Sequence, residues 1–430
     1  MTAEPRPMTL SLPPLSLLPK HSPAMRPLDF AQVARRARDP DARLQALWGE
    51  RLPGKRVFGM PAGRHALWAF LDAAKIPRDG EVIVAGYNYY VVVRLLAQWG
   101  LRPVFVDIDL ATLSLDAAEV AKAVNETTRL VLVTHMFGAP ADIDAILAIC
   151  RPRGIKVFED CAHAVGSRDR HGQLGARGDG ALFSFGPQKL VNCFGGGMLA
   201  LDETLAEGWT PPPQPKVAWT VAASTPAKAL LSVCMTPSLY RWTLRPLISL
   251  GRFLAARGLP WLRDLASPSK DVAGYRFDPA SRPPFAPFMP FLCARQLQRL
   301  DGNVEARRAV VARIKAATAH LGPYEFLDED RFGRANGSYF GVLVDDSEGF
   351  TRAMLKAGVE VEPHEFYDCA SLPQFASFAA TCPRARLASD HLVRLPSYPQ
   401  LTGRRLDRII RAMERYARRT QPVATETAPC

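Results

Sequence analysis

Residues 158–198 read FEDCAHAVGSRDRHGQLGARGDGALFSFGPQKLVNCFGGGM, and this stretch decides the fold class. The apolar runs IKVFED, ALFSFG and GMLALD overlap it and have the length and β-rich composition of buried strands. In a largely parallel sheet, ligands bind just outside the carboxyl ends of the strands. The stretch therefore predicts an α/β protein whose functional side chains follow directly after its strands.

The chain around this stretch, from Val57 to Asp202, repeats the pattern. Further strand-like runs read EVIVAGY, VFVDID and LVLVTHMF, and the amphipathic helical patterns LDAAEVAKAV and ADIDAILAIC lie between strands. Such alternation is typical of a mixed, mostly parallel sheet covered by helices. We predict an N-terminal arm and helix over 1–45, a large α/β domain over 46–275 and a smaller C-terminal α/β domain over 276–430. We also expect one helix from Leu28 to Trp48 and another from Leu292 to Leu321.

The composition excludes a disordered chain, a collagen-like repeat and a coiled-coil rod, because 48% of the 430 residues are hydrophobic and 22% are charged. Basic residues exceed acidic ones by 12, which favours an anionic partner. Seven of the basic residues and no acidic one lie in the segment 216–263. We interpret this segment as an insertion that either packs on the protein or makes weak contact with an anionic lipid surface. The C-terminal basic helix alternates with acids, which predicts a solvated face rather than a nucleic-acid site.

The eight cysteines form no CxxC pair and no Cys/His group with zinc spacing, so we predict no metal site. Free thiols are typical of a cytoplasmic protein. The apolar N-terminal stretch LSLPPLSLLP is broken by proline and lacks the features of a signal peptide. No uncharged apolar run reaches about 18 residues, so no membrane-spanning helix is expected.

Three features of the chain complement one another chemically. Asp160 ends the strand IKVFED, Lys189 follows the strand ALFSFG, and Ser184 lies between them. The backbone amides of Gly63 and Arg64 open the helical pattern HALWAFLDAA, where a helix N-terminus binds anions. Each feature alone has an ordinary interpretation as a helix cap, a solvated lysine or a turn. Together, an acid for a pyridinium nitrogen, an amine that attacks carbonyls and a phosphate cup are what pyridoxal 5′-phosphate requires.

The sequence resembles the DegT/DnrJ/EryC1/StrS aminotransferases, a branch of the fold-type I pyridoxal-phosphate enzymes. The resemblance runs from about Val57 to Met413 and is weakest across 204–290. The stretches that carry it, in family order, are GRHALWAFL, GEVIVAGYNYY, RPVFVDID, HMFGAPADIDAI, VFEDCAHAVGS, GDGALFSFGPQK, GGGM, QLQRLD and VRLPSYPQLT.

The resemblance implies a role for each matching position. Lys189 corresponds to the catalytic lysine that holds the cofactor covalently, and Asp160 to the acid that pairs with the pyridine nitrogen. Ser184, with the amides of Gly63 and Arg64, corresponds to the phosphate site. Among the three tyrosines that follow the strand EVIV, Tyr89 stands where the family places an aromatic side chain on the cofactor ring.

This chain departs from the family at some of these positions. His163 replaces the usual Gln near the cofactor's phenolic oxygen, where histidine still donates a hydrogen bond but can titrate. A buried histidine with a purely structural role is the alternative. Arg64 replaces the usual Thr, and Gly195 replaces a Glu that often follows the lysine.

The resemblance implies a homodimeric, pyridoxal-phosphate-dependent aminotransferase with a role in polysaccharide or antibiotic sugar biosynthesis. The donor would be an amino acid, usually glutamate or glutamine, and the acceptor an anionic keto sugar linked to a nucleotide. Two alternatives stay open, namely dehydration or elimination on a sugar and a non-catalytic member of the same fold. Lys189 favours transamination, because family members that dehydrate sugars lack this lysine.

Overall fold

The computed structural model describes most of the chain. The described residues are 17–22, 26–212, 234, 237–240, 242, 246, 276–279, 285–364 and 366–420. Nearly all of the basic segment 216–263 lies outside these residues, and with it the expectation of lipid contact.

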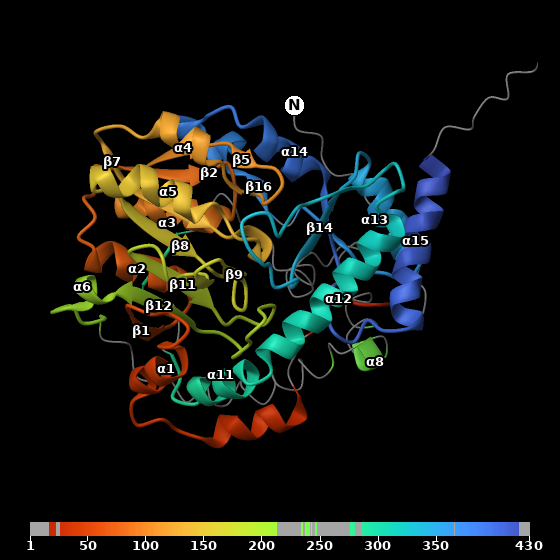
Figure 1. Ribbon diagram of the computed structural model, residues 1–430, viewed down its shortest axis with the longest axis horizontal. Coiled ribbons are helices and arrows are strands. Elements are labelled where there is room, and N and C mark those ends of the chain that lie inside the picture. Colours follow the sequence, from red (N-terminus) through yellow and green to blue (C-terminus); the bar gives the residue numbers. More distant parts are fainter. Residues whose placement is uncertain are drawn as a thin grey trace, which may run out of the picture.

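A seven-stranded sheet forms the centre of the molecule (Figure 1). The strand β12 runs antiparallel to both of its neighbours, whereas the other six strands share one direction. This confirms the mixed, mostly parallel sheet. In spatial order the strands are β1 (Lys55–Met60), β12 (Gly197–Asp202), β11 (Gly180–Ser184), β8 (Lys156–Asp160), β7 (Thr128–Thr134), β2 (Glu81–Ala85) and β4 (Arg102–Val106).

Alternating side chains of the strands enter two different hydrophobic clusters. Leu182 of β11 packs in a cluster with Phe70, whereas the next residue, Phe183, packs in a second cluster with Trp48. Both faces of the sheet are therefore covered, as expected for strands of nearly continuous apolar sequence. The helices around the sheet are α1 (Pro40–Trp48), α2 (Gly63–Ala73), α3 (Tyr90–Trp99), α4 (Ala117–Ala123), α5 (Ile143–Cys150), α6 (Glu203–Ala206) and α11 (Met289–Leu297).

The single helix expected from Leu28 to Trp48 was wrong. A 3-10 helix spans Pro27–Ala34, and α1 begins only at Pro40, because proline is favoured at the start of a helix and the side chain of Asp39 caps α1 by accepting a hydrogen bond from Ala42 N.

The helix expected from Leu292 to Leu321 is also divided in two, α11 and α12 (Leu300–Thr318). The break lies at Arg299, which has non-helical backbone angles and whose guanidinium forms two hydrogen bonds with the buried carboxylate of Asp29.

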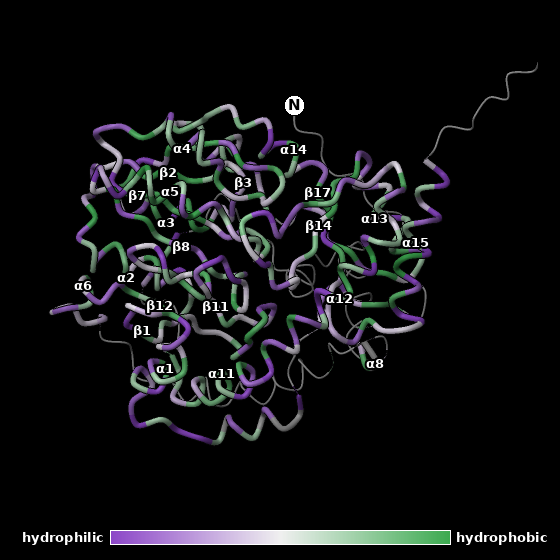
Figure 2. Tube along the Cα trace, in the orientation of Figure 1, coloured by the Kyte–Doolittle hydropathy of each residue, from purple (hydrophilic) through white to green (hydrophobic). Residues whose placement is uncertain are grey.

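A four-stranded antiparallel sheet forms the second, smaller unit. In spatial order its strands are β13 (Glu325–Phe326), β14 (Phe340–Leu343), β17 (Leu392–Leu395) and β15 (Glu362–Pro363). The helix α12 runs diagonally from α11 toward this sheet and packs on α15 (Figure 1). The remaining helix of this unit is α13 (Ser347–Lys356), and α15 spans Arg404–Thr420. Figure 2 shows hydrophobic and hydrophilic residues alternating along α15, whose apolar side chains Ile409, Met413 and Tyr416 are buried.

The chain after β15 returns to the large sheet. There β16 (Tyr367–Asp368) pairs with β3 (Tyr87–Asn88). The first turn of α14 (Pro383–His391) lies against Asp107, whose carboxylate accepts hydrogen bonds from the backbone N–H groups of Arg384 and Ala385. The remaining short elements are β5 (Ile108–Asp109), β6 (Ser114–Leu115), β9 (Arg168–Asp169), β10 (Gly172–Gln173), α8 (Pro237–Tyr240) and the 3-10 turns Met136–Gly138, Arg151–Arg153, Cys369–Ser371 and Pro373–Phe378.

None of the helices within the described ranges has the length and apolar character needed to cross a bilayer.

Candidate active site

Asp160 lies at the carboxyl end of β8, where the parallel pairing with β11 places it opposite Leu182. Its side chain is buried, and Oδ1 accepts a hydrogen bond of 2.9 Å from Ala162 N. Burial raises the pKa of Asp160, and the Ala162 amide and the positive charge of Lys189 oppose that shift. A buried carboxylate is costly without a cation nearby, so Asp160 is suited to pairing with a positively charged ring nitrogen.

Ser184 and Lys189 lie on either side of Gly186, just beyond the end of β11. Ser184 is the last residue of β11, two residues beyond the partner of Asp160. A carbon placed on Gly186 would lie 3.9 Å from Ser184 Oγ and 4.0 Å from Lys189 Cγ, so the hydroxyl and the lysine stem flank one open position. The side chain of Lys189 is partly exposed, which leaves its amine within reach of a ligand.

Gly63 begins α2 directly beside Ser184. A side-chain carbon on Gly63 would lie 3.5 Å from Ser184 Cβ, and one on Gly197 would lie only 2.6 Å from Gly63 N. Ala62 forms an isolated parallel bridge with Gly196, which fixes the start of the helix against the glycine run. The amides of Gly63 and Arg64 lie in the first turn of α2, where backbone N–H groups lack partners within the helix. The structure thus brings Gly63, Arg64 and Ser184 together.

Tyr89 lies at the rim of this region. It precedes α3, is 36% exposed, and donates a backbone hydrogen bond of 2.7 Å to Asn88 Oδ1. Its ring centre is 6.1 Å from that of Phe366, which in turn is 5.5 Å from His163. The ring of Phe366 therefore lies between Tyr89 and His163 and links Tyr89 to the residues near Lys189.

His163 stacks on Tyr339, with ring centres 4.1 Å apart and planes inclined by 20°. Asn336 holds the backbone here, because its amide donates a 2.7 Å hydrogen bond to the His163 carbonyl. Burial lowers the pKa of His163 well below its ordinary value, and the positive charges of Lys189 and Arg394 lower it further. His163 is therefore neutral near physiological pH.

The sequence analysis did not identify two residues that lie near Lys189, Tyr339 and Arg394. Lys189 Nζ lies 5.7 Å from the centre of the Tyr339 ring, and Arg394 Cζ lies 4.6 Å from the same point. Tyr339 gives no signal in the sequence, because an aromatic residue before a strand is common in any core. Arg394 did give one, since a charge inside the apolar strand LVRL is unusual.

The departure at Gly195 has a backbone explanation. Gly195 has a φ of 145° and Gly196 a φ of 80°, both in the region that favours glycine. An acidic side chain at position 195 would require a different path for the loop that follows Lys189.

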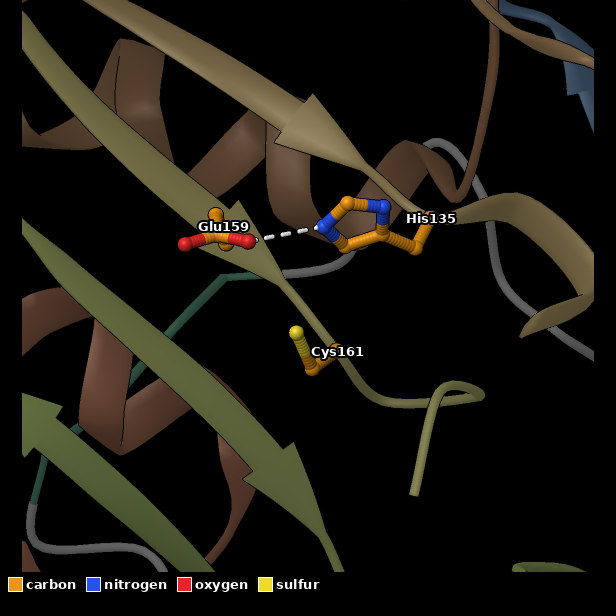
Figure 3. A group of neighbouring side chains, drawn as sticks. All are labelled: His135, Glu159 and Cys161. Carbon is orange, nitrogen blue, oxygen red and sulfur yellow. Dashed lines mark hydrogen bonds and ion pairs between the residues drawn. The ribbon is translucent and has the colours of Figure 1, made fainter. Parts of the chain in front are cut away.

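A second group of side chains, His135, Glu159 and Cys161, lies together at the carboxyl ends of β7 and β8 (Figure 3). Ligand atoms of His135, Glu159 and Cys161 all lie within 4.8 Å of one another, a separation that a metal ion could bridge. His135 Nε2 donates to Glu159 at 2.9 Å and Nδ1 accepts from Ala141 N at 3.1 Å, so both ring nitrogens are engaged. Both Glu159 oxygens also accept backbone hydrogen bonds. We interpret the group as a structural link.

The arrangement suits pyridoxal phosphate. A buried acid, a reachable lysine amine and a hydroxyl beside the N-terminus of a helix converge at the ends of two neighbouring strands. They match the three polar parts of that cofactor, which are its ring nitrogen, its aldehyde and its phosphate.

Two curated proteins are similar to part of this chain. A pleiotropic regulatory protein of Geobacillus stearothermophilus is 37% identical over 155 residues, which cover 36% of this chain and 42% of that protein. An L-glutamine:scyllo-inosose aminotransferase of Streptomyces griseus is 38% identical over 141 residues, 33% of each protein. The matched stretches thus span less than half the length of either relative.

Solved structures resemble almost the whole chain. The sugar aminotransferase CalS13 of Micromonospora echinospora has a TM-score of 0.68 and 20% identity, with 92% of this chain and 99% of that chain covered. DesI, solved in the presence of its TDP-sugar product, has a TM-score of 0.68 and 20% identity, with 94% and 93% covered. This likeness confirms the fold-type I architecture.

A family model matches residues 52–209 and 291–414, on both sides of the basic segment. The matched residues include the strand ends that carry Asp160 and Ser184, as well as Lys189 and the C-terminal strand LVRL. The model describes enzymes that use pyridoxal phosphate, in agreement with the residues of the site. The chain belongs to the DegT/DnrJ/EryC1/StrS aminotransferase family.

Proposed function

We propose that this protein is a pyridoxal-phosphate-dependent aminotransferase that transfers an amino group from an amino acid to a keto sugar. The observation that carries the proposal is the convergence of Asp160, Ser184 and Lys189 at the ends of β8 and β11. The similarity to sugar aminotransferases and to an inosose aminotransferase supports the substrate class.

Each residue of the site has a defined task in this reaction. When bound, the cofactor supplies a conjugated ring that accepts electrons from the substrate carbon. The Asp160 carboxylate would keep the ring nitrogen protonated, and Lys189 would hold the cofactor and then move a proton at its Nζ. Ser184 Oγ and the amides of Gly63 and Arg64 would bind the phosphate.

Two further residues would shape the ring pocket. Tyr89 would cover one face of the ring, which excludes water and fixes the ring plane. His163, being neutral, would donate one hydrogen bond from its ring and retain the other nitrogen as an acceptor.

The amino donor and the form of the acceptor are finer points of the proposal. We propose glutamate or glutamine as donor and a nucleotide-linked keto sugar as acceptor. The excess of 12 positive charges suits a diphosphate, whereas the relative from Streptomyces griseus is named for scyllo-inosose and glutamine. A homodimer completes the proposal and is tested by light scattering on the purified holoenzyme.

The test is a half-reaction with the reconstituted enzyme. L-glutamate and L-glutamine are expected to convert its absorbance from the aldehyde form to the amine form of the cofactor, and Lys189→Ala is expected to abolish the conversion. The matched control is Lys122→Ala, because Lys122 is 71% exposed and forms an ion pair with Glu119 on the surface of α4. Absence of conversion with any amino donor would contradict transamination.

Acceptors are separated by a second measurement. The amine form of the enzyme is mixed with nucleotide-linked keto sugars and with a free keto-cyclitol, and aminated products are identified by mass. Conversion of the free cyclitol alone would overturn the nucleotide-linked assignment and leave the aminotransferase assignment intact.

A regulatory role without catalysis is the second candidate, favoured by the similarity to the pleiotropic regulatory protein. In that case, cells that carry Lys189→Ala would keep the wild-type phenotype although the purified variant has lost its half-reaction.

A further inference from the structure

Lys189 lies in an irregular loop whose shape is not set by a sheet ladder. Residues 185–196 join β11 to β12 and contain no regular helix or strand. Two backbone hydrogen bonds close the neck of this loop, because Cys193 N and Gly195 N both donate to the Phe185 carbonyl, at 2.9 Å and 3.2 Å. The position of Lys189 inside the loop therefore depends on the other contacts that brace it.

Asn192 bridges the loop from within. Its Nδ2 donates a 3.1 Å hydrogen bond to the Pro187 carbonyl, and its Oδ1 accepts one of 2.8 Å from Phe194 N. The residue is only 1% exposed. Because Pro187 precedes Lys189 by two positions and Asn192 follows it by three, the bond between them closes a ring of chain around the lysine. A shift of Asn192 would thus be passed on to Lys189.

Gln296 of α11 holds Asn192 by both of its backbone groups. Asn192 N donates to Gln296 Oε1 at 2.9 Å, and Gln296 Nε2 donates to the Asn192 carbonyl at 2.8 Å. Nε2 also donates to the Leu292 carbonyl at 3.1 Å, which fixes the amide against its own helix. All hydrogens of this buried amide are therefore engaged, and its orientation is determined. The side chain replaces the ladder partner that the loop lacks.

One face of α11 contacts two consecutive residues of the loop. Cys293 and Gln296 are three positions apart and so lie on the same side of the helix. Cys293 Sγ lies 3.4 Å from Cys193 Sγ, directly after Asn192. The helix thus braces the loop at one point, where the chain turns back toward β12.

The backbone beyond this point is strained. Phe194 has a φ of 64°, in the left-handed region that is unfavourable for a side chain of this size, and Gly195 and Gly196 follow it with φ values of 145° and 80°. Such a conformation persists only where the surrounding contacts hold it in place. The loop is therefore expected to relax when its brace is removed.

We propose that Gln296 is a positioning residue for Lys189. By fixing Asn192, it holds residues 185–196 in the conformation that presents the lysine amine to the cofactor. The inference rests on the proposed role of Lys189 and assigns part of that role to a helix about 100 positions away along the chain. Gln296 acts through the backbone of Asn192, so it is not itself a catalytic residue. An amine that is already in place bonds to its ligand without a further cost of ordering.

Cofactor binding tests the inference without turnover. Gln296→Met keeps the approximate length of the side chain but cannot hydrogen-bond the backbone of Asn192. We expect the dissociation constant of pyridoxal phosphate, from fluorescence titration of the full-length apoprotein, to rise about 10-fold or more. The matched control is Gln298→Met, the same chemical change at an exposed position just after α11, which should bind as the wild type does.

A second pair of variants separates positioning from general support of the fold. In Lys189→Ala, the cofactor has no amine to bond with and is held by groups such as Asp160 and Ser184, which lie outside the loop. If Gln296 acts through Lys189, adding Gln296→Met to Lys189→Ala should change the dissociation constant by less than about 2-fold. A merely structural role would weaken binding equally with and without the lysine.

Hydrogen exchange reports on the loop itself. The Asn192 amide donates to Gln296, so exchange of the peptides that cover 185–196 should be faster in the Gln296→Met apoprotein than in the wild type. Thermal unfolding shows whether each variant is folded. Gln296→Glu retains an oxygen acceptor for Asn192 N and provides a second variant if the methionine variant does not fold; its exchange and its affinity should fall between the other two proteins.

The failures of the inference and of the proposed function differ. Wild-type binding that depends on Lys189, combined with an effect of Gln296→Met that is absent or is the same in both backgrounds, would overturn the inference alone. Equal binding of pyridoxal phosphate by the wild type and by Lys189→Ala would instead overturn the proposed role of Lys189 and, with it, the proposed function.

Discussion

His135 Nε2 donates a 2.9 Å hydrogen bond to Glu159 Oε2, and both side chains are fully buried. Because His135 Nδ1 accepts from Ala141 N, the proton must lie on Nε2 and the ring is a true donor to the carboxylate. The bond joins the end of β7 to the residue immediately before Asp160. The position of Asp160 thus depends on this pair, and His135 N also donates a 3.1 Å hydrogen bond to the Asp160 carbonyl.

Loss of this bond should destabilise the protein and disturb the site. In His135→Ala, a buried carboxylate loses its side-chain donor, and we expect the free energy of unfolding to fall by about 2 kcal/mol. Thermal unfolding of the holoenzyme and of the apoprotein measures the change. The exposed pair of α13 provides the control, since Glu348→Gln should leave the melting temperature unchanged.

The same pair predicts a dependence of stability on pH. Burial alone raises the pKa of Glu159, but the hydrogen bond from His135 and the amides of Gly178 and Gly175 bring it below its ordinary value. A carboxyl whose folded pKa is lowered stabilises the fold above its unfolded pKa, about 4.3, and loses that contribution as the pH falls. The melting temperature should therefore drop on acidification, and should drop less in Glu159→Gln. Parallel curves for the two proteins would contradict this account.

Gly197 is required by the close approach of β12 to the start of α2. A methyl group there would lie 2.6 Å from Gly63 N and 2.7 Å from the Phe183 carbonyl, so Gly197→Ala must displace backbone at the phosphate-binding residues. We expect a loss of about 2 kcal/mol in stability and weaker cofactor binding, measured by fluorescence titration. Gly302→Ala is the control, because no atom of another described element lies within 4 Å of its added carbon and alanine is favoured over glycine in a helix.

Asp160 should be needed as a charge and not only as a hydrogen-bond acceptor. Asp160→Asn keeps the shape of the side chain but cannot hold a proton on the ring nitrogen, so we expect the half-reaction to slow by about 100-fold or more. The absorbance spectrum of the bound cofactor should shift as well, which separates this effect from simple loss of the cofactor. Asp345→Asn, at an exposed position, should change neither the rate nor the spectrum.

His163 should behave as a neutral donor. Because burial and the nearby charges lower the pKa of His163 well below its ordinary value, no proton is gained or lost near neutrality. The rates of wild type and His163→Gln should therefore show the same dependence on pH between about 6 and 8. A wild-type step in this range that the glutamine variant lacks would show that His163 titrates.

The sequence alone predicted the α/β class, because strand-like runs such as ALFSFG are buried on both faces and alternate with amphipathic helices. It also predicted Asp160, Ser184 and Lys189 as a group, since residues that follow parallel strands meet at one edge of the sheet. It failed at Pro40, where the Asp39 cap starts a new helix, and at Arg299, where the chain breaks between α11 and α12 beside an ion pair with the distant Asp29.

Only the tertiary structure decided which residues surround Lys189. Tyr339 and Arg394 are 150 or more positions away along the chain, and nothing local to β14 or β17 indicates that their side chains face the large sheet. Local sequence determines the period of a strand and therefore which residues share a face. Which face meets the other unit depends on how the two sheets pack, and that is a property of long-range contacts alone.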